Sequence, residues 1–162
     1  MLAELTETTT EPVEITTEVP VEVIDMPSFN HSYLCAEILG QLYANKAIKA
    51  LPELTLDINK GLTPDISVYP REKVAPNFLK DFPKYPEIPL LAIEVISANQ
   101  NIQDVLEKAE LLVSHGIKSV WAVEPFTNTI FVTTASGVQK FFSQEIVSEN
   151  ITVDFKKIFA DN

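Results

Sequence analysis

The stretch Leu90-Leu91-Ala92-Ile93-Glu94-Val95-Ile96 places one acidic residue inside an otherwise apolar run. Such a run predicts a strand that is buried on both faces near the centre of a sheet. A carboxylate in a buried strand is costly unless it is neutralised, paired with a positive charge or bound to a cation. The sequence therefore predicts a partner for Glu94.

The segments after this run predict a parallel crossover. Apolar residues recur at helical spacing over residues 101–115, and Gly116 marks the end of that helix. Residues 119–124 are apolar enough to form the next strand. A strand, a helix and a strand in this order favour two parallel neighbours in one sheet. Hairpin-like strands over residues 129–134 and 137–142 are expected to follow.

The segments before the run predict a helix and a hairpin. Apolar residues at three-and-four spacing favour a helix over residues 29–47. Residues 50–58 and 65–69 indicate two short strands joined through a turn at residues 59–61. Five prolines make residues 70–89 a surface excursion rather than a regular element.

A short helix that begins at Asp154 and runs to Ala160 is expected to close the chain. Together these elements predict an α/β (α+β) fold in which helices flank a central mixed β-sheet. With 162 residues, 46% of them apolar, the chain is expected to build one core. We expect a single domain over residues 26–162.

The charge is unevenly distributed along the chain. The net charge is −11, and residues 1–25 hold seven acids and no Lys or Arg. These residues are expected to form an acidic arm, either flexible or an edge strand. The remainder holds sixteen acids against twelve bases, so its charge is only −4. Charge alone therefore neither supports nor excludes DNA as a partner.

The sequence shows no basic start with an apolar stretch behind it and no apolar run long enough to span a membrane. The single Cys35 lies among apolar neighbours, which favours a packed thiol over a catalytic or bridging one. We therefore expect a cytoplasmic protein that does not insert into membranes.

Two acids in the predicted sheet are candidates for metal binding. Asp65 follows Pro64 at the start of one strand, and Glu94 lies within another. Magnesium prefers carboxylate and carbonyl oxygens and keeps waters, one of which can become a nucleophile. The alternative is a structural ion pair between Glu94 and Lys108. Lys108 could instead pair with Asp104, four residues earlier on the same helix.

The two histidines have simpler interpretations. His115 precedes Gly116 and is expected to interact with the dipole at the end of its helix. His31 is expected to be a residue of the first helical turn rather than a catalytic base.

An ordered set of residues between about positions 26 and 160 resembles the Uma2 family (DUF820) of restriction-endonuclease-like proteins, which are numerous in cyanobacteria. Ser28-Phe29-Asn30-His31 is similar to the family's entry to its first helix. The residues that carry the rest of the resemblance are Thr63-Pro64-Asp65-Ile66-Ser67-Val68, Ala92-Ile93-Glu94-Val95-Ile96-Ser97, Asp104, Lys108, Gly116-Ile117 and Trp121.

This resemblance implies a nuclease core of the PD-(D/E)xK superfamily. Asp65 and Glu94 would then hold Mg²⁺, or Mn²⁺ in its place, together with the main-chain carbonyl of Val95. Lys108 would do the work of a lysine that usually lies two positions after the acid, where this chain has Ile96.

Glu37 and Asp104 would be accessory acids of the same site. A solvated helix position is nearly as good an explanation for Glu37.

The resemblance also implies a function, magnesium-dependent hydrolysis of DNA by a metal-activated water. A homodimer would supply two such sites for two strands. Two positions depart from the family, with Leu112 in place of the usual Tyr and Ser119 in place of a frequent Glu. The alternative is therefore a catalytically weak or inactive domain that binds a protein or a nucleic acid.

Overall fold

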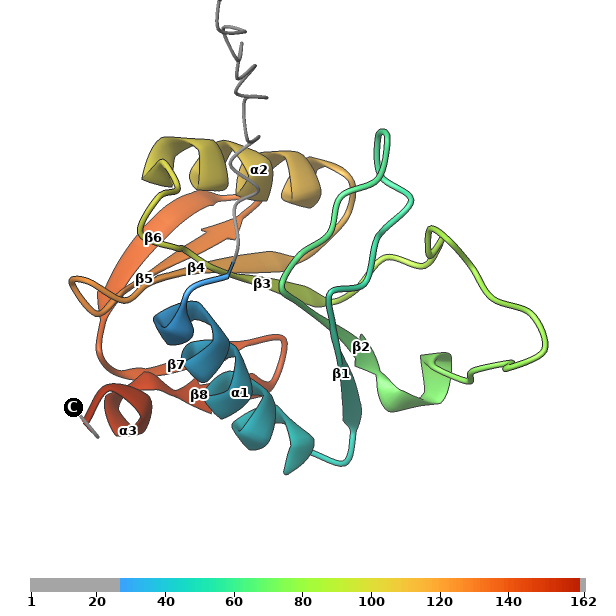
Figure 1. Cartoon of the computed structure of the whole chain (residues 1–162), viewed down its shortest axis with the longest axis horizontal. Helices are drawn as coiled ribbons and strands as arrows, with labels where there is room; N and C mark the ends of the chain where they lie inside the picture. Colours follow the sequence, from blue (N-terminus) through green and yellow to red (C-terminus); the bar gives the residue numbers. More distant parts are fainter. Residues whose placement is uncertain (1–26, 161–162) are drawn as a thin grey trace, which may run out of the picture.

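The computed structural model describes residues 27–160, so the predicted acidic arm lies outside the described residues. Six strands form one sheet in the order β1-β2-β3-β4-β5-β6, and β7 pairs with β8 (Figure 1). The elements in chain order are α1 (Phe29–Tyr43), β1 (Ile48–Pro52), β2 (Ile66–Pro70), the 3-10 helix η1 (Arg71–Lys73), β3 (Leu91–Val95), α2 (Ile102–Ser114), β4 (Ser119–Glu124), β5 (Thr129–Thr134), β6 (Gly137–Phe142), β7 (Glu145–Ser148), β8 (Ile151–Asp154) and α3 (Phe155–Ala160).

The sheet is mixed, as the sequence predicts. Strands β3 and β4 are parallel, and α2 connects them. The other neighbouring pairs in the sheet are antiparallel. All five residues of β3 are buried, which confirms the central strand predicted from its apolar run.

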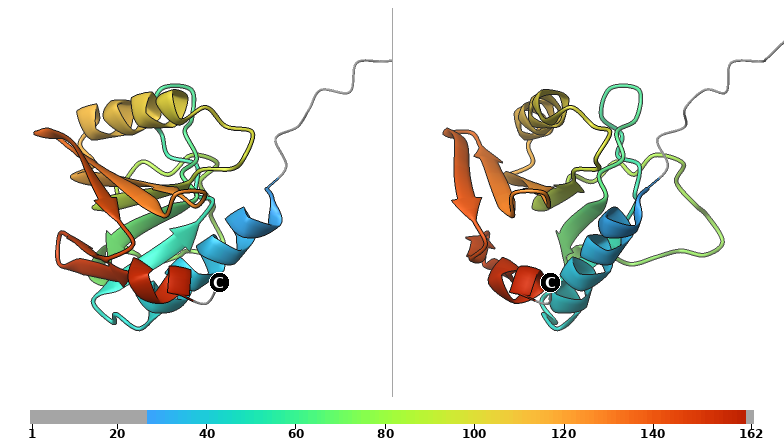
Figure 2. Two further views of the ribbon diagram at one scale, coloured as in Figure 1. Left: turned by 90° about the vertical axis from the view of Figure 1, so that its left-hand side faces the viewer. Right: turned by 60° about the vertical axis from the view of Figure 1, so that its left-hand side comes forward.

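Helix α2 covers one face of the sheet, while α1, α3 and the β7–β8 hairpin lie on the other (Figures 1 and 2). Side chains along β3 alternate between the two faces. Leu91, Ile93 and Val95 pack in the core with α1, whereas Ala92 packs with residues of α2. Glu94 therefore belongs to the face that α2 covers.

The predicted hairpin exists, but its first strand is shifted. Strand β1 ends at Pro52, and the expected strand over residues 54–58 is a loop. Glu53 adopts a positive φ of 51°, which turns the chain out of the ladder. Leu56 and Ile58 are nevertheless buried in the core that lies with α2. The apolar alternation at these positions reflects burial of a loop rather than a strand.

The first helix ends at Tyr43 rather than near Ala47. Asn45 explains the earlier end, because its side-chain oxygen accepts a hydrogen bond from the Ala47 N–H at 3.0 Å. Such local side-chain bonds compete with helical ones. At the other end of the chain, Asp154 accepts a hydrogen bond from the Lys157 N–H at the start of α3, which confirms the predicted terminal helix.

The sequence analysis missed the β7–β8 hairpin. Glu149 and Asn150 form its turn, both with positive φ, as tight hairpins require. Glu-Asn is a weak turn signal because it lacks the glycine that marks many such turns. The hairpin is joined to the sheet by Ser148, whose hydroxyl accepts hydrogen bonds from Trp121 Nε1 at 2.8 Å and from Ser119 Oγ at 3.1 Å.

Within residues 27–160, no helix combines the length and the apolar character needed to cross a membrane.

The contact between Ser148 and Trp121 predicts a measurable contribution to stability. In the Ser148→Ala variant the buried indole N–H loses its acceptor, so we expect the free energy of unfolding to fall by about 1–3 kcal/mol. Urea denaturation followed by the fluorescence of Trp121, the single tryptophan, measures this change. Ser136→Ala, at an exposed position, is the control and should change stability by less than about 0.5 kcal/mol. Equal stability of the two variants would contradict this role of Ser148.

Candidate functional site

Asp65 and Glu94 lie side by side at one end of β2 and β3. The ladder ends where Ile66 pairs with Ile93, and Asp65 is the residue before Ile66, while Glu94 is the residue after Ile93. The negative charge of Asp65 lies close enough to act on Glu94. The Asp65 carboxylate also accepts a hydrogen bond from the main-chain N–H of Val95, with 2.7 Å between Oδ2 and the nitrogen. The two predicted carboxylates therefore lie near each other, and the main-chain group of Val95 that contacts Asp65 is the N–H rather than the carbonyl predicted as a metal ligand.

Lys108 completes this group from α2. Its Nζ lies 2.5 Å from Glu94 Oε1, and the Glu94 side chain is 8% exposed against 30% for that of Lys108. Lys108 reaches the sheet because Val105, Ala109 and Leu112 bury the adjacent face of α2. The same ammonium donates a weaker hydrogen bond to the carbonyl of Thr63 at 3.4 Å.

The partner of Lys108 is therefore Glu94 rather than Asp104. Asp104 lies in the first turn of α2 and is exposed. No ion pair joins it to Lys108 among the described residues.

Burial dominates the acid-base behaviour of Glu94. Loss of solvent raises the pKa of Glu94 to about 7, the Lys108 ammonium opposes this rise, and the negative charge of Asp65 adds to it. Two carboxylates held this close repel each other unless positive charge is shared between them. The site thus has a strong electrostatic preference for cations.

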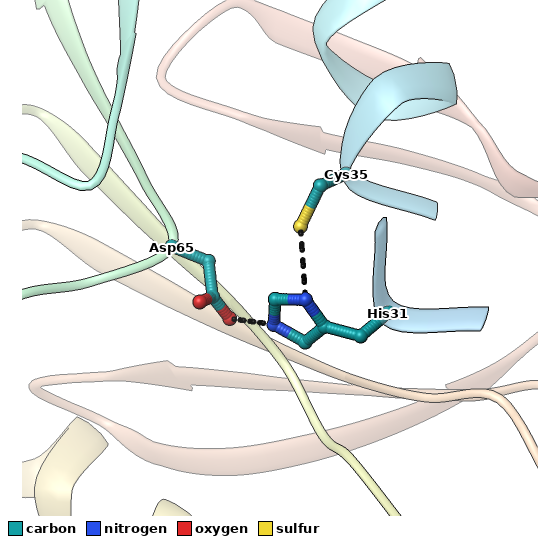
Figure 3. A group of neighbouring side chains, drawn as sticks. All are labelled: His31, Cys35 and Asp65. Atoms are coloured by element: carbon teal, nitrogen blue, oxygen red, sulfur yellow. Dashed lines mark hydrogen bonds and ion pairs between the residues drawn. The ribbon is translucent and has the colours of Figure 1, made fainter. Parts of the chain in front are cut away.

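His31 is a site residue that the sequence analysis did not identify. It lies in the first turn of α1, as expected, and its main-chain N–H is capped by the Ser28 hydroxyl. Its ring extends to the sheet, where Nε2 lies 3.1 Å from Asp65 Oδ2. The other ring nitrogen, Nδ1, lies 3.9 Å from the Cys35 thiol. Figure 3 shows the imidazole between the thiol and the carboxylate.

A sequence signal for His31 exists in its spacing to Cys35. Residues four apart on a helix share a face, so this spacing places the two side chains together. Their proximity to Asp65 depends on how α1 packs on the sheet, which the spacing does not determine.

A cavity of about 360 Å³ opens beside this group. Its lining residues are Pro27, His31, Glu53, Thr63, Asp65, Ser97 and Gln100. Glu53 is a second residue that sequence reasoning missed, and it holds a positive φ of 51° that L-amino acids rarely adopt. A strained acidic residue at a cavity is a feature of functional sites.

The accessory roles predicted for Glu37 and Asp104 have no supporting contact among the described residues. Glu37 is half-buried on α1, and neither acid lines the cavity. Both roles stay predictions. His115 is the C-cap residue of α2, and its Nδ1 lies 2.9 Å from the Leu111 carbonyl oxygen, in agreement with its expected place at the helix end.

The donor atoms of this site fit a hard divalent cation. The carboxylates of Asp65 and Glu94 lie close together at one end of the sheet, and the buried Oε1 of Glu94 contacts the Lys108 ammonium. Oxygen donors with this charge suit Mg²⁺ or Mn²⁺.

Comparison with known proteins agrees with this fold. A family described as "Uma2: Putative restriction endonuclease" matches residues 2–159. A crystal structure titled as a "putative nuclease belonging to DUF820", from Anabaena variabilis, superposes with a TM-score of 0.69. It is 21% identical to this chain, and the match covers 83% of each of the two chains. Comparison with curated proteins gives no match.

The six-stranded mixed sheet flanked by helices defines an α+β protein whose fold is similar to that of the "putative nuclease". More specifically, the chain belongs to the Uma2 family.

The ion pair between Glu94 and Lys108 predicts a non-additive response to mutation. Lys108→Met leaves a buried carboxylate without its positive partner, so we expect the free energy of unfolding to fall by about 2–3 kcal/mol. The double variant that also carries Glu94→Gln should regain part of this loss, because the unpaired charge is removed. Urea denaturation of the wild type, Lys108→Met, Glu94→Gln and the double variant measures the coupling energy between the two residues.

Lys118→Met is the matched control, since Lys118 is exposed. It should change stability by less than about 0.5 kcal/mol. If Lys108→Met is as stable as this control, the ion pair does not stabilise the fold.

Proposed function

We propose that this protein is a magnesium-dependent endonuclease that hydrolyses DNA phosphodiester bonds at Asp65, Glu94 and Lys108. The observation that carries this function is the proximity of the Asp65 carboxylate, just before β2, to the buried Glu94 carboxylate of β3, which the Lys108 ammonium contacts. Family membership supports the reaction class, because the family is described as a "putative restriction endonuclease".

In this proposal the site is of the PD-(D/E)xK type. Pro64 and Asp65 supply the first part of the motif, and Glu94 supplies the second acid. Asp65, Glu94 and the main-chain carbonyl of Val95 hold Mg²⁺, and Mn²⁺ can replace it. The cation, when bound, lowers the pKa of a coordinated water and neutralises charge on the phosphate.

Lys108 stabilises negative charge that develops on the phosphate in the transition state. It replaces the motif's usual lysine, whose position is taken by the buried Ile96. The partial exposure of Lys108 supports this role, because a substrate can reach the ammonium from the solvent side. His31 orients the Asp65 carboxylate through its contact with Oδ2.

The substrate is DNA in this proposal, and we expect the enzyme to act in the cytoplasm as a homodimer. A two-fold dimer presents two identical sites, which suits cleavage of two antiparallel strands.

A second candidate function is a nuclease-fold domain that binds a protein or a nucleic acid without cutting. Exposed apolar side chains in the excursion between β2 and β3 favour protein binding, since Phe78 is 95% and Leu79 99% exposed. Nicking of supercoiled plasmid distinguishes the endonuclease from the binding domain.

Metal binding is expected to depend on both carboxylates. Isothermal calorimetry with MgCl₂ or MnCl₂ should detect a cation on the wild-type protein and a loss of affinity of roughly tenfold or more in Asp65→Asn and Glu94→Gln, because each removes a charged oxygen ligand. Glu110→Gln, an exposed position on α2, should bind like wild type. Equal affinity in Glu94→Gln and Glu110→Gln would exclude Glu94 as a ligand.

Nicking of supercoiled plasmid tests the reaction itself. We expect Mg²⁺- or Mn²⁺-dependent nicking by the wild-type protein and by Glu110→Gln. Asp65→Ala, Glu94→Ala and Lys108→Met should lower the rate on the order of a hundredfold or more, since each removes a group that the reaction needs. Substitution of the predicted accessory acids, Glu37→Gln or Asp104→Asn, should have a smaller effect.

Nicking that persists in Asp65→Ala and Glu94→Ala would indicate a contaminating nuclease. Metal binding without nicking by any form would favour the interaction domain.

A further inference from the structure

We propose that His31, Cys35 and Asp65 form a zinc-binding site at the edge of the cavity. A ligand atom of each residue lies within 4.8 Å of those of the other two. The thiol, the imidazole and the carboxylate come from two elements, α1 and the residue that precedes β2 (Figure 3).

Helix α1 presents the first two ligands together. His31 and Cys35 are four residues apart, the spacing at which helices present two metal ligands on one face. Leu34, Ile38 and Leu42 are buried against the sheet, and they set the rotation of the helix. This rotation brings the His31 ring to Asp65, with 3.1 Å between Nε2 and Oδ2.

The distances allow a metal after small side-chain rotations. Zinc bonds of about 2.0 Å to nitrogen or oxygen and about 2.3 Å to sulfur place tetrahedral ligands roughly 3.3–3.8 Å apart. The three ligand atoms lie within 4.8 Å of one another, so a bound zinc ion would draw them together by small rotations of the side chains. The cavity beside Asp65 leaves room for a water as the fourth ligand.

The chemistry of this set selects zinc over magnesium. A thiolate and an imidazole are soft or borderline ligands that Zn²⁺ prefers, whereas Mg²⁺ takes oxygen donors. Cys35 is half-buried, and burial together with Asp65, Glu53 and Glu94 raises the pKa of its thiol to about 12. The same three negative charges attract a divalent cation, which displaces the thiol proton to solvent when it binds.

This site shares Asp65 with the magnesium site of the proposed function. Zinc and magnesium would then compete for one carboxylate, so zinc inhibits the nuclease at concentrations far below those of magnesium. The inhibition rests on the proposed function, but zinc binding itself does not.

Cobalt substitution tests the binding site directly. Titration of the full-length protein with CoCl₂ should give a sulfur-to-cobalt charge-transfer band, and ZnCl₂ should abolish this band. Cys35→Ser should lack the band, while His31→Gln should weaken cobalt binding by roughly tenfold or more. His115→Gln, which removes the other histidine, is the matched control and should bind like wild type. Thermal unfolding of each variant without metal checks that it folds.

Absence of the band in folded wild-type protein, or its persistence in Cys35→Ser, would overturn the zinc site. Equal loss of affinity in His31→Gln and His115→Gln would also overturn it.

Glu94→Gln separates the zinc site from the magnesium site. We expect this variant to keep zinc affinity within a few-fold of wild type, measured by calorimetry with ZnCl₂, because Glu94 is not among the three ligands. It should lose affinity for Mn²⁺, as the proposed function requires. In wild type, added ZnCl₂ should raise the MnCl₂ concentration needed for half-maximal binding, whereas in Cys35→Ser this effect should be lost.

Zinc binding with no manganese binding would support the zinc site and contradict the proposed magnesium site. Manganese binding with no zinc binding would contradict the zinc site and support the proposed magnesium site.

Discussion

The contact between Lys108 and Glu94 is the interaction on which the site depends. Glu94 lies in β3, all of whose residues are buried, so an unpaired carboxylate there would destabilise the fold. Helix α2, which connects β3 to its parallel neighbour β4, packs over this face and carries the compensating ammonium. The crossover thus joins the two strands and also neutralises the acid. Of the two side chains, Lys108 is the one that reaches solvent, with 30% of its side chain exposed against 8% for Glu94.

A second polar contact, on the other carboxylate, comes from α1. His31 reaches Asp65 from the helix that covers the opposite face of the sheet. Each of the two neighbouring carboxylates therefore has a basic partner from a different helix, and the cavity opens beside Asp65. The arrangement joins oxygen donors suited to magnesium with a thiol and an imidazole suited to zinc. Asp65 belongs to both of the proposed ligand sets.

Much of the fold and part of the site could be predicted from the sequence. The apolar run around Glu94 indicated the central strand, and the helical spacing after it indicated the crossover helix that carries Lys108. The alternation at residues 54–58 was misleading, because a buried loop and a strand can show the same apolar pattern. The β7–β8 hairpin was missed because its Glu-Asn turn has no glycine. Local patterns report burial more reliably than backbone conformation.

The sequence by itself determined that Glu94 needs a positive partner, since an acid flanked by apolar residues in a central strand cannot remain solvated. It also determined that His31 and Cys35 share a helix face, because a spacing of four residues is close to one helical turn of about 3.6 residues. Only the tertiary structure decided which charges meet. Lys108 pairs with Glu94 rather than with Asp104, and His31 meets Asp65, because these contacts depend on how two helices pack against opposite faces of one sheet. Side-chain partners across elements are set by packing, which spacing along the chain does not encode.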